Sequence, residues 1–305
     1  MLPASYRAFF MTINRTIDKG EVRRSFSRAA STYDANAVLQ REAGQRLFDR
    51  LDFIVHSPKR ILDLGCGTGL GSFWLAKRYP YSEVLALDLA MPMLDQLNNR
   101  AGFWDWLNPN SLLRRIHPIC GDMDALPFRS GEVDMIWSAF ALQWSVDLDA
   151  TLAEMYRVMK EGGLLMFATF GPDTLVELRK IFAKLDGLPH VSQFIDMHDV
   201  GDALIRAGFV TPVMDMEYFT LTYKDVKTLM RDLKDLGAHN AAHGRMRGLS
   251  GRGWLARITE EYEFLRREGL LPATFEVVYG HAWAGSFSHL PDKKTIRIIP
   301  DRGLV

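Results

Sequence analysis

The sequence has 305 residues, which is enough for one large domain with an insertion. Lys plus Arg and Asp plus Glu number 37 each, so the chain lacks the basic excess typical of a nucleic-acid-binding protein. No apolar run approaches the roughly 18 residues that a transmembrane helix requires. The start lacks an uninterrupted apolar stretch followed by a small-residue cleavage site, so we expect a cytoplasmic protein, translated from Met1 or from Met11.

Cysteine usage points to a reducing compartment. The two cysteines, Cys66 and Cys120, do not have the spacing of metal ligands. We therefore predict neither a disulfide framework nor a metal site.

The N-terminal part predicts helices. Over residues 21–53 the apolar positions recur at helical spacing, namely Val22, Phe26, Ala29, Ala30, Tyr33, Leu39, Ala43, Leu47 and Leu51. We expect two helices here, within a helical extension that covers residues 1–57.

Between residues 60 and 170 short apolar runs alternate with helical stretches. The runs are RILDLG, EVLALDL, RIHPICGD, VDMIWSAF and GLLMFATF. Helices are predicted over 70–79, 92–100 and 148–160, the last closed by Gly162 and Gly163. This alternation favours parallel strands joined by right-handed crossovers, so we predict an α/β fold with a Rossmann-like, doubly wound, mostly parallel sheet.

The order of elements loosens after residue 170. Helical patterns cover 173–185 and 196–207, strand-like patterns cover 209–223 and 274–283, and a long helical, Gly- and Arg-containing segment lies between those strands. We predict one domain over 58–284, with a helical lid inserted at about 224–270 and a C-terminal tail over 285–305.

A glycine-rich turn follows the first predicted strand. Asp63, Gly65, Gly67 and Gly69 lie where that strand ends and a helix begins. Glycines let the backbone turn tightly and approach a ligand closely, and the helix N-terminus offers unpaired N–H donors. Dinucleotide sites use the same device, so this turn alone does not identify the ligand.

Acidic residues at the next strand ends narrow the choice. Asp88, beside Leu89, closes the second strand, where a carboxylate accepts both hydroxyls of a ribose. Asp122 and Met123 follow the third strand, where they suit an adenine amino group and ring. Asp63 favours a cationic amino-acid moiety, because it would repel a pyrophosphate. We therefore expect a nucleoside cofactor that carries an ammonium group.

These segments together resemble the successive motifs of class I S-adenosylmethionine-dependent methyltransferases. The matching stretches are DLGCGTG, LALDLA, GDMDALPF, VDMIWSAFALQW and MKEGG. The resemblance implies the class I methyltransferase fold, with S-adenosyl-L-methionine as cofactor. The remaining alternative is a generic doubly wound domain with incidental acids at its strand ends.

The flanking segments resemble the BioC family, the malonyl-acyl carrier protein O-methyltransferases of biotin synthesis. The family's opening pattern is matched by Phe26, Arg28, Ala29, Ala30, Tyr33, Asp34, Ala37, Leu39 and Gln40. Further similarity runs through SAFALQWSVDL, TFGPDTLVELR, SQFIDMHDVGDAL and LKDLGAHNAAHGRMRGL, so it covers roughly residues 22–283. It implies methyl esterification of the free carboxyl of a malonyl thioester, which starts pimeloyl chain synthesis.

One relative in the same superfamily keeps an alternative open. A mitochondrial complex I assembly factor that hydroxylates an arginine shares the segment 170–179 and an element like 236–240. An arginine hydroxylase and a non-catalytic assembly factor are therefore alternative functions.

The family pattern implies that Tyr33 caps the cofactor, although an ordinary core tyrosine is the alternative. Gln143 and Trp144 follow the fourth strand, where residues at strand ends face the ligand crevice, so we expect them to line the substrate channel, with simple packing as the alternative. An ionised malonyl carboxylate is already a nucleophile, so a cation to orient it suffices. The candidates are Arg179 and Arg28, with Arg245 and Arg247 further along the chain.

An acyl carrier protein is typically acidic and would require a basic docking surface. Arg245, Arg247 and Arg252, with Arg266 and Arg267, form a candidate patch, although clustered arginines are commonly a solvated face. The sequence leaves open whether the acyl carrier is the protein or coenzyme A, and it does not indicate the oligomeric state.

Overall fold

The computed structural model describes residues 17–100, 112–185, 190–235 and 252–285. Its centre is a seven-stranded sheet in the order β3-β2-β1-β4-β5-β7-β6. The strands are β1 Arg60–Leu64, β2 Glu83–Asp88, β3 Ile116–Cys120, β4 Val133–Ala139, β5 Met159–Phe170, β6 Phe209–Tyr223 and β7 Leu271–Ala284. The first five are parallel, whereas β7 is antiparallel to both β5 and β6. The mostly parallel α/β sheet predicted from the sequence is therefore present.

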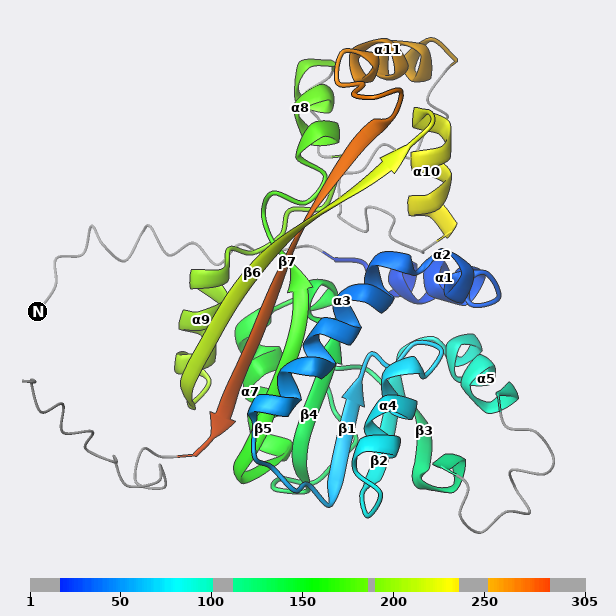
Figure 1. Ribbon diagram of the computed structural model, residues 1–305. Helices are drawn as coiled ribbons and strands as arrows, with labels where there is room; N and C mark the ends of the chain where they lie inside the picture. The colour runs from blue at the N-terminus through cyan, green and yellow to red at the C-terminus, as the bar shows by residue number, and fades with distance from the viewer. Residues whose placement is uncertain (1–16, 101–111, 186–189, 236–251, 286–305) are drawn as a thin grey trace, which may run out of the picture.

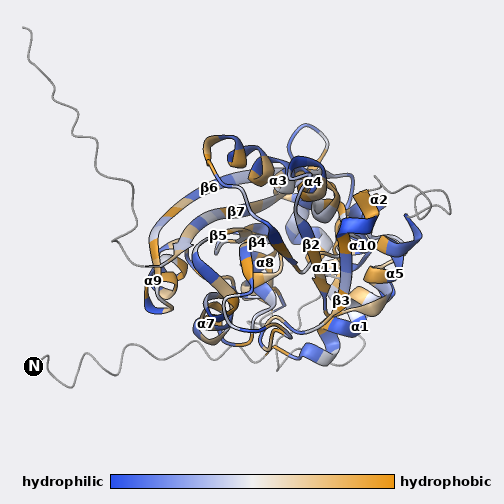
Figure 2. Ribbon diagram, turned by 90° about the horizontal axis from the view of Figure 1, so that it is seen from below, coloured by the Kyte–Doolittle hydropathy of each residue, from blue (hydrophilic) through white to orange (hydrophobic). Residues whose placement is uncertain are grey.

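Helices cover both faces of this sheet, as seen in Figures 1 and 2. Side chains alternate between faces along a strand, so each strand contributes to two apolar cores. One core joins the sheet to α3 and α4, and the other joins it to α7 and α9. The helices that follow the first 60 residues are α4 Leu70–Arg78, α5 Met91–Asn99, α7 Leu148–Val158, α8 Val176–Leu185, α9 Met197–Arg206, α10 Val226–Asp235 and α11 Arg252–Glu263, with short 3-10 turns η3 Leu112–Arg115 and η4 Leu142–Trp144.

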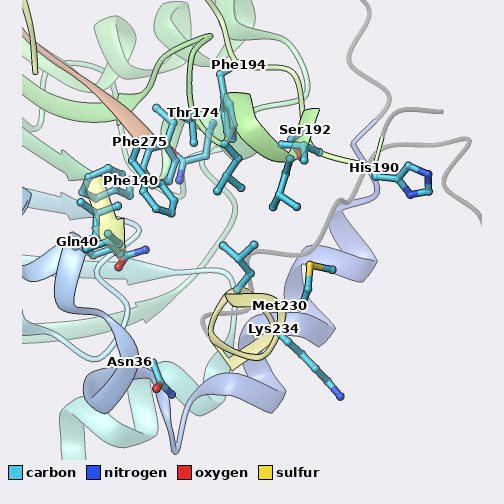
Figure 3. A pocket seen from close by; sticks show the side chains of 18 of the residues that line it. Asn36, Gln40, Phe140, Thr174, His190, Ser192, Phe194, Met230, Lys234 and Phe275 are labelled. Carbon is cyan, nitrogen blue, oxygen red and sulfur yellow. The ribbon is translucent and has the colours of Figure 1, made fainter. Parts of the chain in front are cut away.

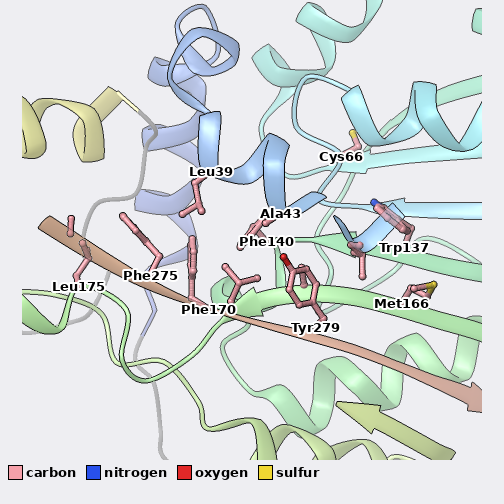
Figure 4. Packing of buried hydrophobic residues seen from close by; sticks show 14 of the residues in the cluster. Leu39, Ala43, Cys66, Trp137, Phe140, Met166, Phe170, Leu175, Phe275 and Tyr279 are labelled. Atoms are coloured by element: carbon pink, nitrogen blue, oxygen red, sulfur yellow. The ribbon is translucent and has the colours of Figure 1, made fainter. Parts of the chain in front are cut away.

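The N-terminal segment folds into more pieces than the two helices predicted. They are α1 Lys19–Ala29, α2 Tyr33–Asn36, α3 Val38–Asp49 and the 3-10 turn η2 Arg50–Phe53. The Asp18 side chain caps α1 by accepting a hydrogen bond from Glu21 N. Arg46 on α3 pairs with Glu217, and Arg50 at the start of η2 pairs with Asp215, which ties this segment to β6. Leu39 and Ala43 of α3 pack toward the sheet side chains shown in Figure 4.

The end of α7 differs from the prediction. The helix stops at Val158, and Met159 already has extended backbone angles, so Gly162 and Gly163 lie within β5 rather than at the helix end. Gly162 has a φ of 76°, which suits glycine, at the irregular start of that strand. The chain therefore enters the strand about one helical turn earlier than expected, and the two glycines lie at a shift in the register between β4 and β5 instead of in a turn.

The two long strands β6 and β7 extend beyond the rest of the sheet (Figure 1). Helices α8, α10 and α11 gather around the extended end, on the side where the parallel strands terminate. The segment between β6 and β7 contains α10 and α11. The expected tail lies mainly outside the described residues, as do residues 1–16. No helix in the described ranges has the length and apolar character needed to cross a membrane.

The sheet provides a sharp stability test at Gly280. A Cβ at this position would lie 2.2 Å from the ring of Phe167 and 2.9 Å from the sulfur of Met214. Phe167 is fully buried and its register partner is Gly280, so the ring has little room to move. We expect Gly280→Ala to lower the free energy of unfolding by about 1–3 kcal/mol, measured by urea denaturation.

Gly253 supplies the matched control, because no atom of the described residues lies within 4 Å of its added Cβ and it is part of α11. Gly253→Ala should leave stability unchanged or raise it by up to about 1 kcal/mol. Equal effects of the two substitutions would contradict the close packing of Phe167 on β7.

Candidate functional site

The glycine-rich turn lies between β1 and α4, at the carboxyl end of this central strand, where the chain must reverse its direction. Gly65, Gly67 and Gly69 have φ values of 74°, 55° and 87°, a region that disfavours other residues. A Cβ on Gly65 would lie 2.3 Å from Ala141, and one on Gly69 would lie 2.5 Å from Leu97 of α5. Gly65 and Gly67 line a cleft, whereas Gly69 is absent from its described lining and allows α5 to approach.

Two carboxylates lie beneath this turn. Asp63 is buried and accepts a hydrogen bond from Ser72 Oγ at 2.5 Å. Burial raises the pKa of Asp63 to about 7, with a further contribution from the charge of Asp88. Asp88 accepts hydrogen bonds from Gly67 N at 2.9 Å and Ala90 N at 2.8 Å, yet its confinement in the cleft still raises its pKa. Both carboxylates would be stabilised by a cationic or hydrogen-bonding ligand.

The cleft consists of two adjoining cavities that share Tyr33, Gly65, Gly67 and Phe140. One contains Asp63. The other is lined by residues from three strand ends, including Asp88, Leu89, Asp122 and Met123. The structure thus brings together the acidic residues predicted at the ends of β1, β2 and β3.

The N-terminal helices cover this cleft and are held down by polar contacts. Lys19 Nζ lies 2.7 Å from Asp122 Oδ1 and 2.9 Å from Asp124 Oδ2. Asp34 accepts a hydrogen bond from Thr68 Oγ1 at 2.5 Å and pairs with Arg100. We call residues 19–36, attached in this way, the roof. Sequence reasoning missed Lys19 and Thr68, because their partners are distant in the chain and no local pattern marks the contacts.

A third, largely apolar cavity adjoins the cleft. Tyr33 and Phe140 line all three cavities, so they stand where the spaces meet. Phe140 has a φ of 60°, a strained value for a non-glycine residue, and its N–H donates to Ala168 O at 2.8 Å. From this junction the apolar cavity passes Phe275 and Phe194 and reaches Met230 on α10, as Figure 3 shows.

The residues predicted on the substrate side have different locations. Tyr33, Gln143 and Trp144 line the apolar cavity. Arg179 on α8 donates to the carbonyl of Pro172 and is absent from the described cavity lining. Arg28 is exposed on α1 and pairs with Glu21. Arg245 and Arg247 lie outside the described residues, and of Arg252 only its place at the start of α11 is described.

Tyr33 remains protonated at this junction. Desolvation, together with the negative charges of Asp88 and Asp34, raises its pKa far above the usual value for tyrosine. Its hydroxyl can therefore donate a hydrogen bond at neutral pH, but it is a poor candidate for a general base.

Comparisons with known proteins agree with this geometry. A methyltransferase domain family matches residues 62–167. The malonyl-acyl carrier protein O-methyltransferase of Laribacter hongkongensis is 56% identical over 271 residues, covering 87% of this chain and 89% of that protein. The protein of the same name from Gallionella capsiferriformans is 52% identical over 267 residues, with 88% and 91% covered.

A solved structure supports the fold independently. The chain is similar to a putative methyltransferase from Bacillus halodurans with a TM-score of 0.54 and 16% identity, covering 78% of this chain and 99% of that one. At this identity the likeness concerns the fold alone. It confirms the class I methyltransferase fold predicted from the sequence.

The pKa of Asp63 makes ligand affinity dependent on pH. The Asp63 carboxyl binds a proton more tightly in the folded protein than in the unfolded chain. Its protonation therefore stabilises the fold fully below about pH 4, and this contribution to the free energy of unfolding is lost as the pH rises through about 7. An ammonium group on the ligand favours the ionised form. We therefore expect the affinity for S-adenosylmethionine, measured by calorimetry, to fall by up to about tenfold per pH unit below pH 7.

Asp63→Asn should bind more weakly and show a shallower pH dependence, because the neutral amide does not titrate. An unchanged slope in this variant would assign the proton uptake to another group.

Proposed function

The chain belongs to the family of malonyl-acyl carrier protein O-methyltransferases, and we propose that it methyl-esterifies the free carboxyl of a malonyl thioester with S-adenosylmethionine as donor. The observation that carries this proposal is the junction at Tyr33 and Phe140, where an apolar cavity meets the acidic cleft. Esterification removes the charge of the malonyl carboxylate. An elongation machinery built for apolar chains can then accept the product, as the biotin role of the family requires.

The cleft has the donors and acceptors that the cofactor needs. We assign the ribose to Asp88 and Leu89, the adenine to Asp122 and Met123, and the amino-acid end to the cavity that contains Asp63. Gly65 and Gly67 keep the turn free of side chains at the cleft, and Gly69 shapes the same turn from behind. When bound, S-adenosylmethionine supplies a methyl group on a positively charged sulfur.

The substrate carboxylate needs no base from the protein, since it is ionised at neutral pH. Tyr33, Phe140, Gln143 and Trp144 therefore orient the acceptor group and exclude water from it. A closed, dry site favours a reaction in which opposite charges neutralise each other, and alignment of the reacting groups could supply several kcal/mol. Arg179 can orient the malonyl carboxylate only if its hydrogen bond to the Pro172 carbonyl breaks.

The apolar cavity gives the thioester arm a route to the surface. It passes α8 and ends near Met230, Lys234 and Trp254 of the inserted helices, so we propose that residues 224–270 act as the lid of this channel. A carrier protein would dock at this outer end, in the cytoplasm, where the two free cysteines stay reduced.

Helix α10 presents a basic stripe at the outer end of the channel. Lys227, Arg231 and Lys234 are spaced at i, i+4 and i+7, so they share one face, and all three are exposed. No ion pair within 4 Å is found for them in the described part of the chain. We propose that this stripe, with Arg245, Arg247 and Arg252, attracts an acidic carrier protein.

Both named relatives are methyltransferases, so they give no support to the alternative functions, arginine hydroxylation and non-catalytic assembly. The two chemistries are distinguished by mass spectrometry: a methyl ester adds one CH2 to the malonyl thioester, whereas a hydroxylase adds one oxygen to a protein arginine.

Asp88→Ala tests the assigned activity. Loss of the carboxylate removes the ribose acceptor and an anchor of the Gly67 turn, so we expect kcat/KM for methyl transfer to malonyl-acyl carrier protein to fall by at least about 100-fold. Asp95→Ala, on the exposed side of α5, is the control and should retain full activity. Full activity of Asp88→Ala would contradict the assigned cofactor site.

The basic stripe is tested by reversing two charges that do not line the channel. Lys227→Glu with Arg231→Glu should raise KM for malonyl-acyl carrier protein by about tenfold at low salt and by less at high salt. The KM for malonyl-pantetheine should not change. The control is Lys59→Glu, an exposed residue directly before β1, which starts at the end of the sheet opposite α10 (Figure 1). An equal rise in KM for both substrates would argue against docking on α10.

A further inference from the structure

The inner end of the apolar cavity has no fixed positive side chain among the described residues. Lys234 and His190 line the cavity at its outer end, and the Lys234 ammonium points away from it in Figure 3. Arg179 is occupied by the Pro172 carbonyl, and Arg28 is exposed on α1. The cations that line the adjoining cleft are engaged elsewhere: Lys19 pairs with Asp122 and Asp124, Arg100 pairs with Asp34, and Arg41 donates to the Asp34 carbonyl. We therefore look for the partner of a malonyl carboxylate among uncharged groups.

Gln143 is an uncharged donor held in one orientation. It is 9% exposed and lies on the short turn η4 that follows β4. Its Oε1 accepts a hydrogen bond from Thr169 Oγ1 at 3.2 Å, and Thr169 is itself buried on β5. Within the described residues Nε2 has no partner and is not enclosed by protein. Since Gln143 lines the apolar cavity, this amide group is available to a ligand there.

Trp144 supplies a second donor next to it. Its Nε1 is closed off from solvent and has no hydrogen-bond partner in the described structure, although buried N–H groups nearly always have one. The indole must therefore turn toward the cavity before this N–H can donate to a ligand. The ring lines both the apolar cavity and the adenosine side of the cleft, and the edge-on contact with Phe26 of the roof, at 5.5 Å between centroids, holds it there. An indole N–H only donates, so it requires an acceptor.

We propose that the malonyl carboxylate is bound by two uncharged donors, the Gln143 amide and the Trp144 indole N–H, with Thr169 as the positioning residue for Gln143. This inference rests on the function proposed above and specifies how the acceptor group is recognised. The positive charge that balances the carboxylate is that of the methyl donor.

This arrangement has a physical advantage over an arginine. A buried carboxylate must be paired, and a guanidinium would compete with the sulfonium for it and lower its nucleophilicity. Amide and indole donors orient the oxygens without neutralising them. The ester product has no charge, so these donors hold it less tightly than the substrate. Carboxylate binding should therefore depend on the charge of the bound nucleoside.

Calorimetry tests this dependence without turnover. The ligands are malonyl-pantetheine and its methyl ester, titrated into the full-length protein loaded with sinefungin, whose amine replaces the sulfonium methyl, or with S-adenosylhomocysteine, whose thioether sulfur carries no charge. The wild-type protein should bind malonyl-pantetheine at least roughly tenfold more tightly with sinefungin. Gln143→Leu should weaken this binding by roughly 10- to 100-fold and leave that of the methyl ester nearly unchanged.

Thr169 is tested by an isosteric pair. Thr169→Val should reduce the preference for the carboxylate by several-fold, because the amide is no longer fixed, and Thr169→Ser should restore it. Gln45→Leu on the outer part of α3 is the matched control and should behave as the wild type. Thermal melts establish that each variant is folded.

The outcomes separate this inference from the proposed function. A wild-type protein that esterifies no malonyl thioester overturns the function and the inference together. An active wild type whose Gln143→Leu variant keeps the full carboxylate preference overturns the donor assignment alone. Equal affinity for malonyl-pantetheine in the presence of sinefungin and of S-adenosylhomocysteine overturns the claim that the charge of the methyl donor balances the carboxylate.

Discussion

The burial of two carboxylates at neighbouring strand ends is the constraint on which the site depends. Asp63 and Asp88 lie beneath one glycine turn, and burial raises the pKa of both. Backbone N–H groups and Ser72 satisfy some of their hydrogen-bonding capacity, but no cation in the described structure pairs with them. The protein without ligand therefore carries an electrostatic cost that a positively charged nucleoside relieves. Selectivity for such a ligand over a dinucleotide follows from that cost.

The roof extends this constraint to the substrate side. Asp34 and Lys19 tie the N-terminal helices to the turn and to the third strand end, and Tyr33 of the same segment faces all three cavities. In the placement proposed above, one element covers both cofactor and substrate, so a movement that releases one would expose the other. Exchange of the nucleoside would then require at least some of the roof contacts to break, and this segment would be a place for a slow step.

The sequence predicted the central strands and most helices because a sheet buried on both faces reads as continuous apolar runs. The predicted strand 209–223 agrees with the bounds of β6. The acidic residues could be located for a second reason: parallel strands bring their carboxyl ends to the same edge of the sheet, so a residue at the end of each predicted strand is expected there. Partners could not be predicted: nothing local connects Lys19 to Asp122, directs Arg179 to a backbone carbonyl, or places Thr169 beside Gln143. These contacts depend on how the helices pack, which no periodicity encodes.

The pairing of β6 with β7 also bears on how the family can vary. Tyr223 and Leu271 are register partners at the end of the ladder, so both ends of the inserted segment leave the sheet from adjacent positions. The length and composition of such an inserted segment can change while the pairing of β6 with β7 stays intact. With the carrier docked on this segment as proposed, a change of the segment would alter which acyl carrier is accepted and leave the nucleoside site unchanged.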